Sequence, residues 1–153
     1  MGLMDKIKGA MNAVTGGAAK VALEFSPSFV YPGDSVQVKI TATSTGGEVK
    51  SKGAFIDVRG WEEVRVKNTG PNQSGYSSVS STTHEKQIQI GNDFVLGANE
   101  TKTFEGQVQL PLGVHPSYTG PNAKHVWEIR GRIEAWGNDP DSGYKPVRVG
   151  YRE

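Results

Sequence analysis

The sequence predicts an all-β fold, an antiparallel β-sandwich preceded by a short N-terminal amphipathic helix. From Ala19 onward, apolar and polar residues alternate with a period of two in several segments, which is the pattern of half-buried strands. The chain has 20 Gly, 8 Pro and only 35% hydrophobic residues, a composition typical of many strands joined by tight turns. We therefore expect a helix at residues 1–18 and one β-domain at residues 19–153. A barrel stays open as the alternative to a sandwich.

Residues 1–18 have a helical rather than a strand pattern. Apolar residues recur at helical spacing, and the polar residues Asp5, Lys6, Lys8 and Asn12 take the other side. Gly16 and Gly17 end the segment. We predict that residues 3–14 form a docking helix for a protein partner, with a contact face of Leu3, Met4, Ile7, Met11 and Val14. Packing of this helix on its own chain stays open, and contact with a membrane is not favoured because few lysines attract anionic lipid.

The first two predicted strands of the β-domain flank a tight turn. Val21, Leu23 and Phe25 lie on one face of the first strand. Tyr31-Pro32-Gly33-Asp34 has the residues of a β-turn, since Pro presets φ and Gly tolerates positive φ. The following strand places four apolar residues on one face, namely Val36, Val38, Ile40 and Ala42.

The middle of the chain predicts one long strand and one long loop. Even-numbered residues from Ala54 to Val66 form an apolar face, with a bend or bulge expected at Gly60. Residues 67–83 are polar and glycine-rich, so we expect a long mobile loop there. Further strands are expected around residues 86–90, 94–96 and 104–110.

The clearest strand of the sequence lies near the C-terminus. Trp127, Ile129, Gly131, Ile133 and Ala135 alternate with four charged residues, Glu128, Arg130, Arg132 and Glu134. Alternating charges on a solvated strand indicate cross-strand ion pairs rather than an anion site. A final strand is expected through Val147, Val149 and Tyr151.

The order of these motifs resembles the arrestin-like family, closest to the N-terminal domain of bacterial sporulation-control arrestin-like proteins. The resemblance rests on Ala18-Ala19-Lys20-Val21, the Tyr31–Asp34 turn, Leu110-Pro111 and Pro116-Ser117-Tyr118-Thr119-Gly120 before the long strand. It implies an immunoglobulin-like (arrestin-type) sandwich and a non-enzymatic adaptor or scaffold that binds proteins through loops and sheet edges, without a cofactor. Arrestins usually have two sandwiches, whereas this chain has length for one. Pairing through an exposed sheet edge, with a second copy or with another protein chain, is therefore expected.

Composition argues against several other functions. A net charge of +1 gives no electrostatic basis for nucleic-acid binding. The chain contains no cysteine, which is consistent with a cytoplasmic protein and excludes thiolate chemistry. Asp5, Lys6 and Lys8 interrupt any signal-peptide core. His84, His115 and His125 lack helical metal-pair spacing, and we interpret them as ordinary loop histidines, although His115 and His125 flank one loop and could approach each other. No catalytic site is expected.

A carbohydrate- or calcium-binding module is the alternative function. Asp139 and Asp141 lie in an acidic turn, Asn138 to Gly143, and are the candidate metal ligands. The same residue types are also those of an ordinary turn, which we favour. Among the tryptophans, Trp127 is expected in the core, whereas Trp61 and Trp136 are candidates for an exposed sugar-stacking surface.

Overall fold

The computed structural model describes residues 19–135, 137 and 139–151 of the chain. The predicted N-terminal helix at residues 1–18 and the candidate Trp136 lie outside the described residues. In the described part, the chain forms strands and no helix, so the predicted all-β class is confirmed. No helix in this part is long and apolar enough to cross a membrane.

The described residues form ten strands. In chain order they are β1 (Ala19–Ser26), β2 (Phe29–Val30), β3 (Ser35–Ser44), β4 (Val49–Lys67), β5 (Tyr76–Gly91), β6 (Phe94–Leu96), β7 (Thr101–Gln109), β8 (Tyr118–Thr119), β9 (Ala123–Ala135) and β10 (Lys145–Val149).

The strands divide into two sheets. The small sheet has the order β1-β3-β7, and the large sheet has the order β2-β10-β9-β4-β5, with β6 added to β4 and β8 added to β9. Two separate sheets are consistent with the predicted sandwich and not with one closed barrel. All pairings are antiparallel except that between β2 and β10, which is parallel at Arg148 and Phe29. The prediction of a purely antiparallel arrangement was therefore wrong at this one edge.

The core lies between the small sheet and the part of the large sheet that faces it. Val36, Val38, Ile40 and Ala42 of β3 are all buried, as their alternation predicts. Opposite them, β9 contributes Trp127, Ile129 and Ile133, each at most 2% exposed. Gly131 leaves room for this packing, because a Cβ there would lie 2.9 Å from Cγ1 of Ile40.

The turn between β2 and β3 forms as predicted. The Asp34 amide donates to the Tyr31 carbonyl at 2.9 Å, and the Tyr31 amide donates to Oδ2 of Asp34 at 3.0 Å. Gly33 has a φ of +88°, a conformation that glycine adopts without strain. The turn fixes where β3 begins and therefore which of its faces meets the core.

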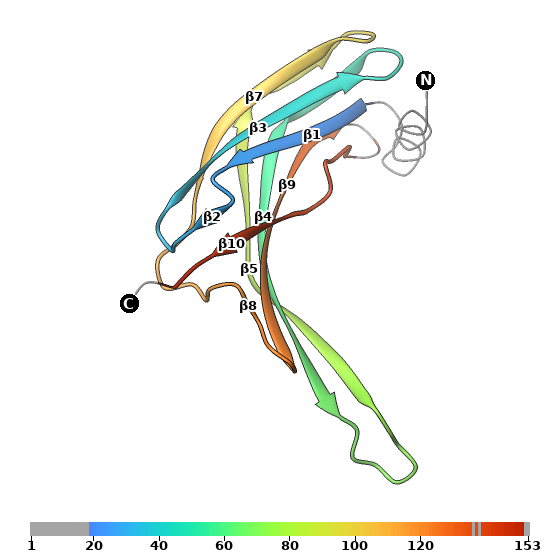
Figure 1. Ribbon diagram of the computed structural model, residues 1–153. Helices are drawn as coiled ribbons and strands as arrows, with labels where there is room; N and C mark the ends of the chain where they lie inside the picture. Colours follow the sequence, from blue (N-terminus) through green and yellow to red (C-terminus); the bar gives the residue numbers. More distant parts are fainter. Residues whose placement is uncertain (1–18, 136, 138, 152–153) are drawn as a thin grey trace, which may run out of the picture.

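Residues 67–83 are not the long loop that their composition predicts. Strand β4 continues to Lys67 and β5 begins at Tyr76, so only residues 68–75 connect them. The pairing shifts register between Gly60 and Trp61, which confirms the irregularity predicted at Gly60. Beyond this shift, residues 61–82 form a β-hairpin that we call the arm. Figure 1 shows the arm projecting away from the two-sheet body of the molecule.

Candidate interaction surfaces

The arm has one strand edge without a neighbour. Strand β5 pairs with β4 along one side, from Gly91 to Tyr76. Along its other side, the described residues provide no strand for residues 76–87. Residues 76–83 are exposed and contain neither proline nor a charged side chain. Proteins usually protect long edges with proline, charge or a covering element, because free edges pair with other chains. Residues 76–83 of this edge lack the first two of these protections.

An apolar strip runs along one face of the arm. Val64 and Val66 of β4 are 39% and 50% exposed, and Val79 of β5 is 61% exposed. Val64 lies directly opposite Val79, so the two side chains share a face. This face continues the even-numbered face of β4 that is buried at Ile56 and Val58. The apolar pattern thus extends beyond the sheet that covers it.

The arm is stabilised by its own local contacts. The guanidinium of Arg65 lies 4.3 Å from the ring centre of Tyr76 on the opposite face from the apolar strip. At the tip, the Asn68 amide donates to the Gly75 carbonyl at 3.0 Å, and Ser77 Oγ donates to Asn68 Oδ1 at 2.7 Å. These contacts define the hairpin tip and the register of its two strands.

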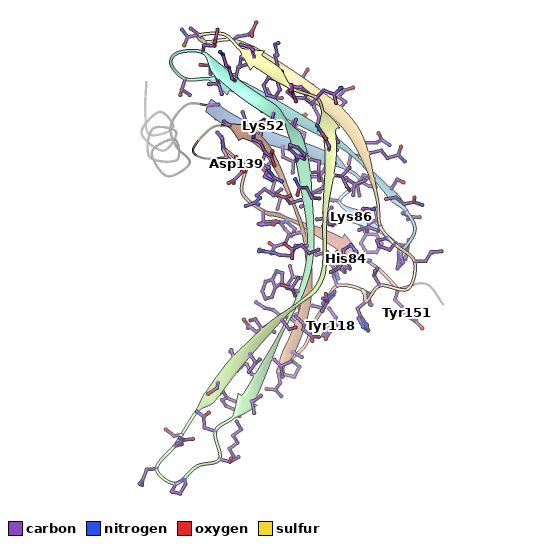
Figure 2. The ribbon with its side chains drawn as sticks, turned by 180° about the vertical axis from the view of Figure 1, so that it is seen from behind. Lys52, His84, Lys86, Tyr118, Asp139 and Tyr151 are labelled. Carbon is purple, nitrogen blue, oxygen red and sulfur yellow. The ribbon has the colours of Figure 1, made fainter. Side chains whose placement is uncertain are left out.

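All three histidines gather around Trp127 at the base of the arm. The rings of His84 and His125 lie 5.3 and 5.6 Å from the Trp127 ring, and His115 lies 6.0 Å from His125. Figure 2 shows His84 where β5 passes from the body into the arm. The predicted approach of His115 to His125 is confirmed. The interpretation of His125 as a loop residue was wrong, because it is buried in β9.

The contacts of His125 fix its tautomer. Nδ1 lies 3.0 Å from the Pro116 carbonyl, which can only accept, so Nδ1 carries the hydrogen. In the neutral imidazole, Nε2 then accepts from the Thr83 hydroxyl at 2.6 Å. Thr83 lies at the register shift of β5, at the base of the arm. His125, in β9, therefore connects the base of the arm with the segment before β8 through its two hydrogen bonds. Neither contact partner is adjacent in sequence, which is why the sequence alone did not reveal this role.

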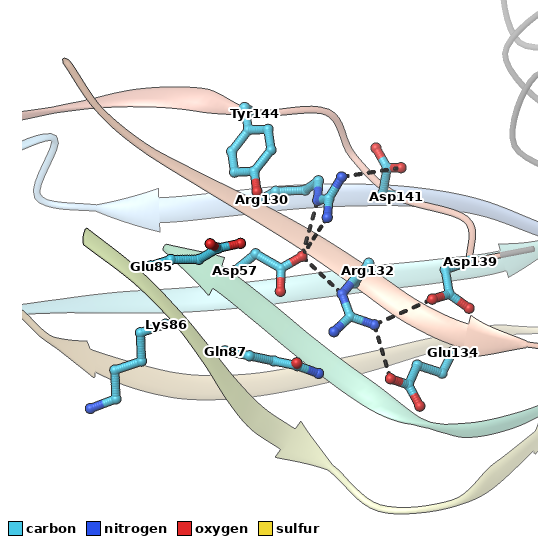
Figure 3. Close-up of a pocket in the computed structure, with 10 residues that line it drawn as sticks. All are labelled: Asp57, Glu85, Lys86, Gln87, Arg130, Arg132, Glu134, Asp139, Asp141 and Tyr144. Carbon is cyan, nitrogen blue, oxygen red and sulfur yellow. Dashed lines mark hydrogen bonds and ion pairs between the residues drawn. The ribbon is translucent and has the colours of Figure 1, made fainter. Parts of the chain in front are cut away.

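A second surface, on the outer face of the large sheet, is built from ion pairs. Oδ2 of Asp57 accepts from Nε and Nη2 of Arg130 at 3.0 and 2.7 Å and from Nε of Arg132 at 2.8 Å. Figure 3 shows both arginines converging on this carboxylate. Arg59 donates to Glu128 at 2.6 Å in the same way. The predicted cross-strand pairing of the alternating charges in β9 is therefore confirmed.

These ion pairs shift the pKa of the groups involved. Burial lowers the pKa of Arg130 and Arg132, but the hydrogen bonds to Asp57 and the negative charges nearby together outweigh burial and hold both pKa values above the ordinary arginine value. Burial also raises the pKa of the Tyr144 phenol, against the opposing effect of Arg130. The three arginines of this face are thus each paired with a carboxylate of the same chain.

The predicted metal candidates belong to this network. Oδ2 of Asp139 lies 3.5 Å from Nη1 of Arg132, and its Oδ1 accepts from the Ala135 amide at 3.3 Å. Oδ1 of Asp141 accepts from the Gly143 amide at 2.7 Å, as in an ordinary Asx turn. Among the described residues, no group of three or more His, Asp or Glu side chains is arranged to hold a metal ion.

The described tryptophans are also used in contacts within the chain. Trp127 is 1% exposed, as predicted, and its Nε1 donates to the His115 carbonyl at 2.7 Å. Trp61 is half-buried, its Nε1 donates to Oε1 of Glu128, and the ammonium of Lys124 lies 5.1 Å from its ring. Trp61 therefore packs against its neighbours on the outer face of the large sheet.

Comparison with known proteins identifies the fold. No protein-family model matches the chain, and no curated protein matches it in sequence. The crystal structure of Spo0M, the sporulation control protein of Bacillus subtilis, is similar, with a TM-score of 0.65 and 18% identity over 89% of this chain. The predicted likeness to sporulation-control arrestin-like proteins is thereby confirmed, at the level of the fold.

This chain spans about half of the Spo0M chain, 51% of its length. A weaker likeness, with a TM-score of 0.48 and 16% identity, is to the alkylpurine DNA glycosylase AlkC of Pseudomonas fluorescens and covers 97% of this chain and 36% of that one.

Proposed function

We propose that this protein is a non-enzymatic adaptor or scaffold of arrestin type that acts through protein–protein contacts in a bacterial regulatory process, such as sporulation or stress control. The observation that carries the proposal is the arm, which combines an open strand edge with an exposed apolar strip. The likeness of the fold to a sporulation control protein supports it. The absence of cysteine from the sequence supports a cytoplasmic location.

The arm offers a known mode of protein recognition. An extended segment of a partner can add a strand to an open sheet edge, where backbone hydrogen bonds supply affinity and alternating side chains supply specificity. The backbone edge of β5 provides the first of these, and Val64, Val66 and Val79 provide an apolar face for the second. This mode needs no cofactor.

The N-terminal segment is a second proposed contact element. Its predicted contact face has two methionines and three aliphatic residues, side chains that adapt to different partners. Deleting residues 1–16 separates docking from packing on the same chain. We expect the deleted protein to keep its melting temperature and to lose partner capture. A loss of several degrees with capture intact would show that the segment is structural.

Affinity capture with the full chain as bait tests the proposed function. Val64→Glu combined with Val66→Glu places charges on the apolar strip at exposed positions, so we expect the fold to remain and the captured proteins to be lost. Val95→Glu is the matched control, because Val95 is also exposed, at 46%, but lies on β6 away from the arm. Equal capture by the arm variant and the control would contradict the proposal.

A further inference from the structure

We propose that two copies of this chain pair through the arm, with the β5 edges antiparallel and Val79 opposite Val79 of the second copy. The inference rests on the proposed function only in that both use the arm. Its basis is an edge that is open, uncharged and self-complementary, beside an apolar strip that the described residues leave uncovered.

The sequence of the edge suits pairing with itself. Residues 76–82 read Tyr-Ser-Ser-Val-Ser-Ser-Thr. With Val79 on the two-fold axis, Ser78 faces the second copy's Ser80 and Ser77 faces the second copy's Ser81. Tyr76 faces Thr82. No charged side chain meets another, and small hydroxyl side chains tolerate such close cross-strand pairs. The edge therefore carries none of the like-charge repulsion that usually prevents edge-to-edge pairing.

The position of Val79 selects this register. It is the one aliphatic residue in the segment 76–82, and a two-fold axis elsewhere along the segment would place it against serine, tyrosine, threonine or the hairpin tip. On the axis, it forms an apolar cross-strand pair with its own copy. Because Val64 lies opposite Val79 within each copy, the apolar strips of the two arms join into one continuous strip. The register that avoids charge contacts is thus also the one that buries apolar surface.

The pairing is small, and its strength is correspondingly limited. Pairing along one strand edge of this length buries less surface than the ~1,200 Å² at the lower end of specific stable interfaces. We expect a dimer that dissociates on dilution, observable over roughly a hundredfold range of protein concentration.

Sedimentation of the full chain with charge variants at Val79 tests the register. Val79 is 61% exposed, so its substitution leaves the core intact. We expect a concentration-dependent dimer for the unmodified protein. Val79→Lys and Val79→Glu should each be monomeric, because each places like charges across the axis. An equal mixture of the two should dimerise again, because opposite charges then meet. A monomer at every concentration, or variants that dimerise alone, would overturn the inference.

A single introduced cysteine gives an independent readout, since the chain has none. Under mild oxidation, Val79→Cys should form a disulfide-linked dimer, because directly opposed residues have Cβ atoms about 5 Å apart. Val95→Cys, at an exposed site off the arm, is the control and should remain monomeric. Equal cross-linking of both variants would contradict pairing at Val79.

The outcome separates this inference from the proposed adaptor function. A monomeric protein that still loses partner capture with the Val64 and Val66 variant overturns self-pairing and leaves the adaptor function standing. If the protein captures no partner but forms a dimer that the Val79 substitutions disrupt, the adaptor function is overturned and self-pairing stands.

Discussion

The two halves of β4 have similar alternating patterns and opposite environments. In the half of β4 that belongs to the body, Ile56 and Val58 are buried, at 0% and 5% exposure. In the arm, Val64 and Val66 continue the same even-numbered face but are 39% and 50% exposed. The small sheet covers the half of β4 in the body and ends before the arm, as Figure 1 shows. An apolar alternation therefore indicates a strand with one apolar face, but whether that face is buried depends on what the rest of the fold places over it.

The difference between the halves is one of cover rather than of strand formation. Strand β4 pairs with β5 in both halves, from Ala54 to Lys67, and β9 continues along β4 as far as Val64. Backbone pairing thus maintains the arm, and side-chain burial maintains the body. The following predictions test this division, beginning with the largest expected effect.

Truncating equivalent positions in the two halves should give unequal losses. Ile56→Ala removes buried methyl groups and leaves a cavity, so we expect a loss of about 3 kcal/mol in the free energy of unfolding. Val64→Ala removes exposed methyl groups, and we expect a change below about 0.5 kcal/mol. Urea unfolding of both variants provides the measurement. Similar losses at both positions would show that the arm is covered in solution.

The ion pairs of the body should contribute more to stability than the cation–π contact of the arm. Asp57→Asn weakens three charge-assisted hydrogen bonds to Arg130 and Arg132, and we expect a loss of about 2 kcal/mol. Arg65→Gln removes an exposed cation–π contact with Tyr76, which we expect to cost about 0.5 kcal/mol. Thermal unfolding of the two variants would contradict this order if Arg65→Gln had the larger effect.

The body should also show a small alkaline pH dependence that the arm does not contribute. Burial raises the pKa of Tyr144 above the ordinary value of about 10. The folded state then binds this proton more tightly than the unfolded state. Its contribution to stability is complete below about pH 10 and is lost as the pH rises through the folded pKa. Tyr144→Phe should unfold with a flatter pH profile in this range, and an unchanged profile would contradict the assignment.

The elements that the sequence predicted correctly depend on local signals. The Tyr31–Asp34 turn follows from Pro and Gly chemistry, and β9 follows from strict alternation between Trp127 and Ala135. The irregularity at Gly60 was predicted from a local signal, a glycine within an alternating strand. Residues that determine their own conformation could be interpreted without the fold.

The features that the sequence missed depend on distant partners. Serine- and threonine-rich residues 76–83 have the composition of a loop, but pairing with β4 makes them a strand, since strand formation depends strongly on context. The parallel pairing of β2 with β10 joins residues more than a hundred positions apart, and His125 contacts Thr83 and Pro116 across the fold. The candidate surface on the arm was missed for the same reason, because the segment was taken for a loop.

Amide hydrogen exchange at two protein concentrations tests the central claim most directly, that the β5 edge of the arm is an open pairing surface. The account predicts that amides of residues 76–82 gain protection as the concentration rises, whereas amides around Ile129 in β9 are protected equally at both. The monomeric Val79→Lys variant should show no such gain. Exchange at residues 76–82 that is the same at both concentrations would contradict the account.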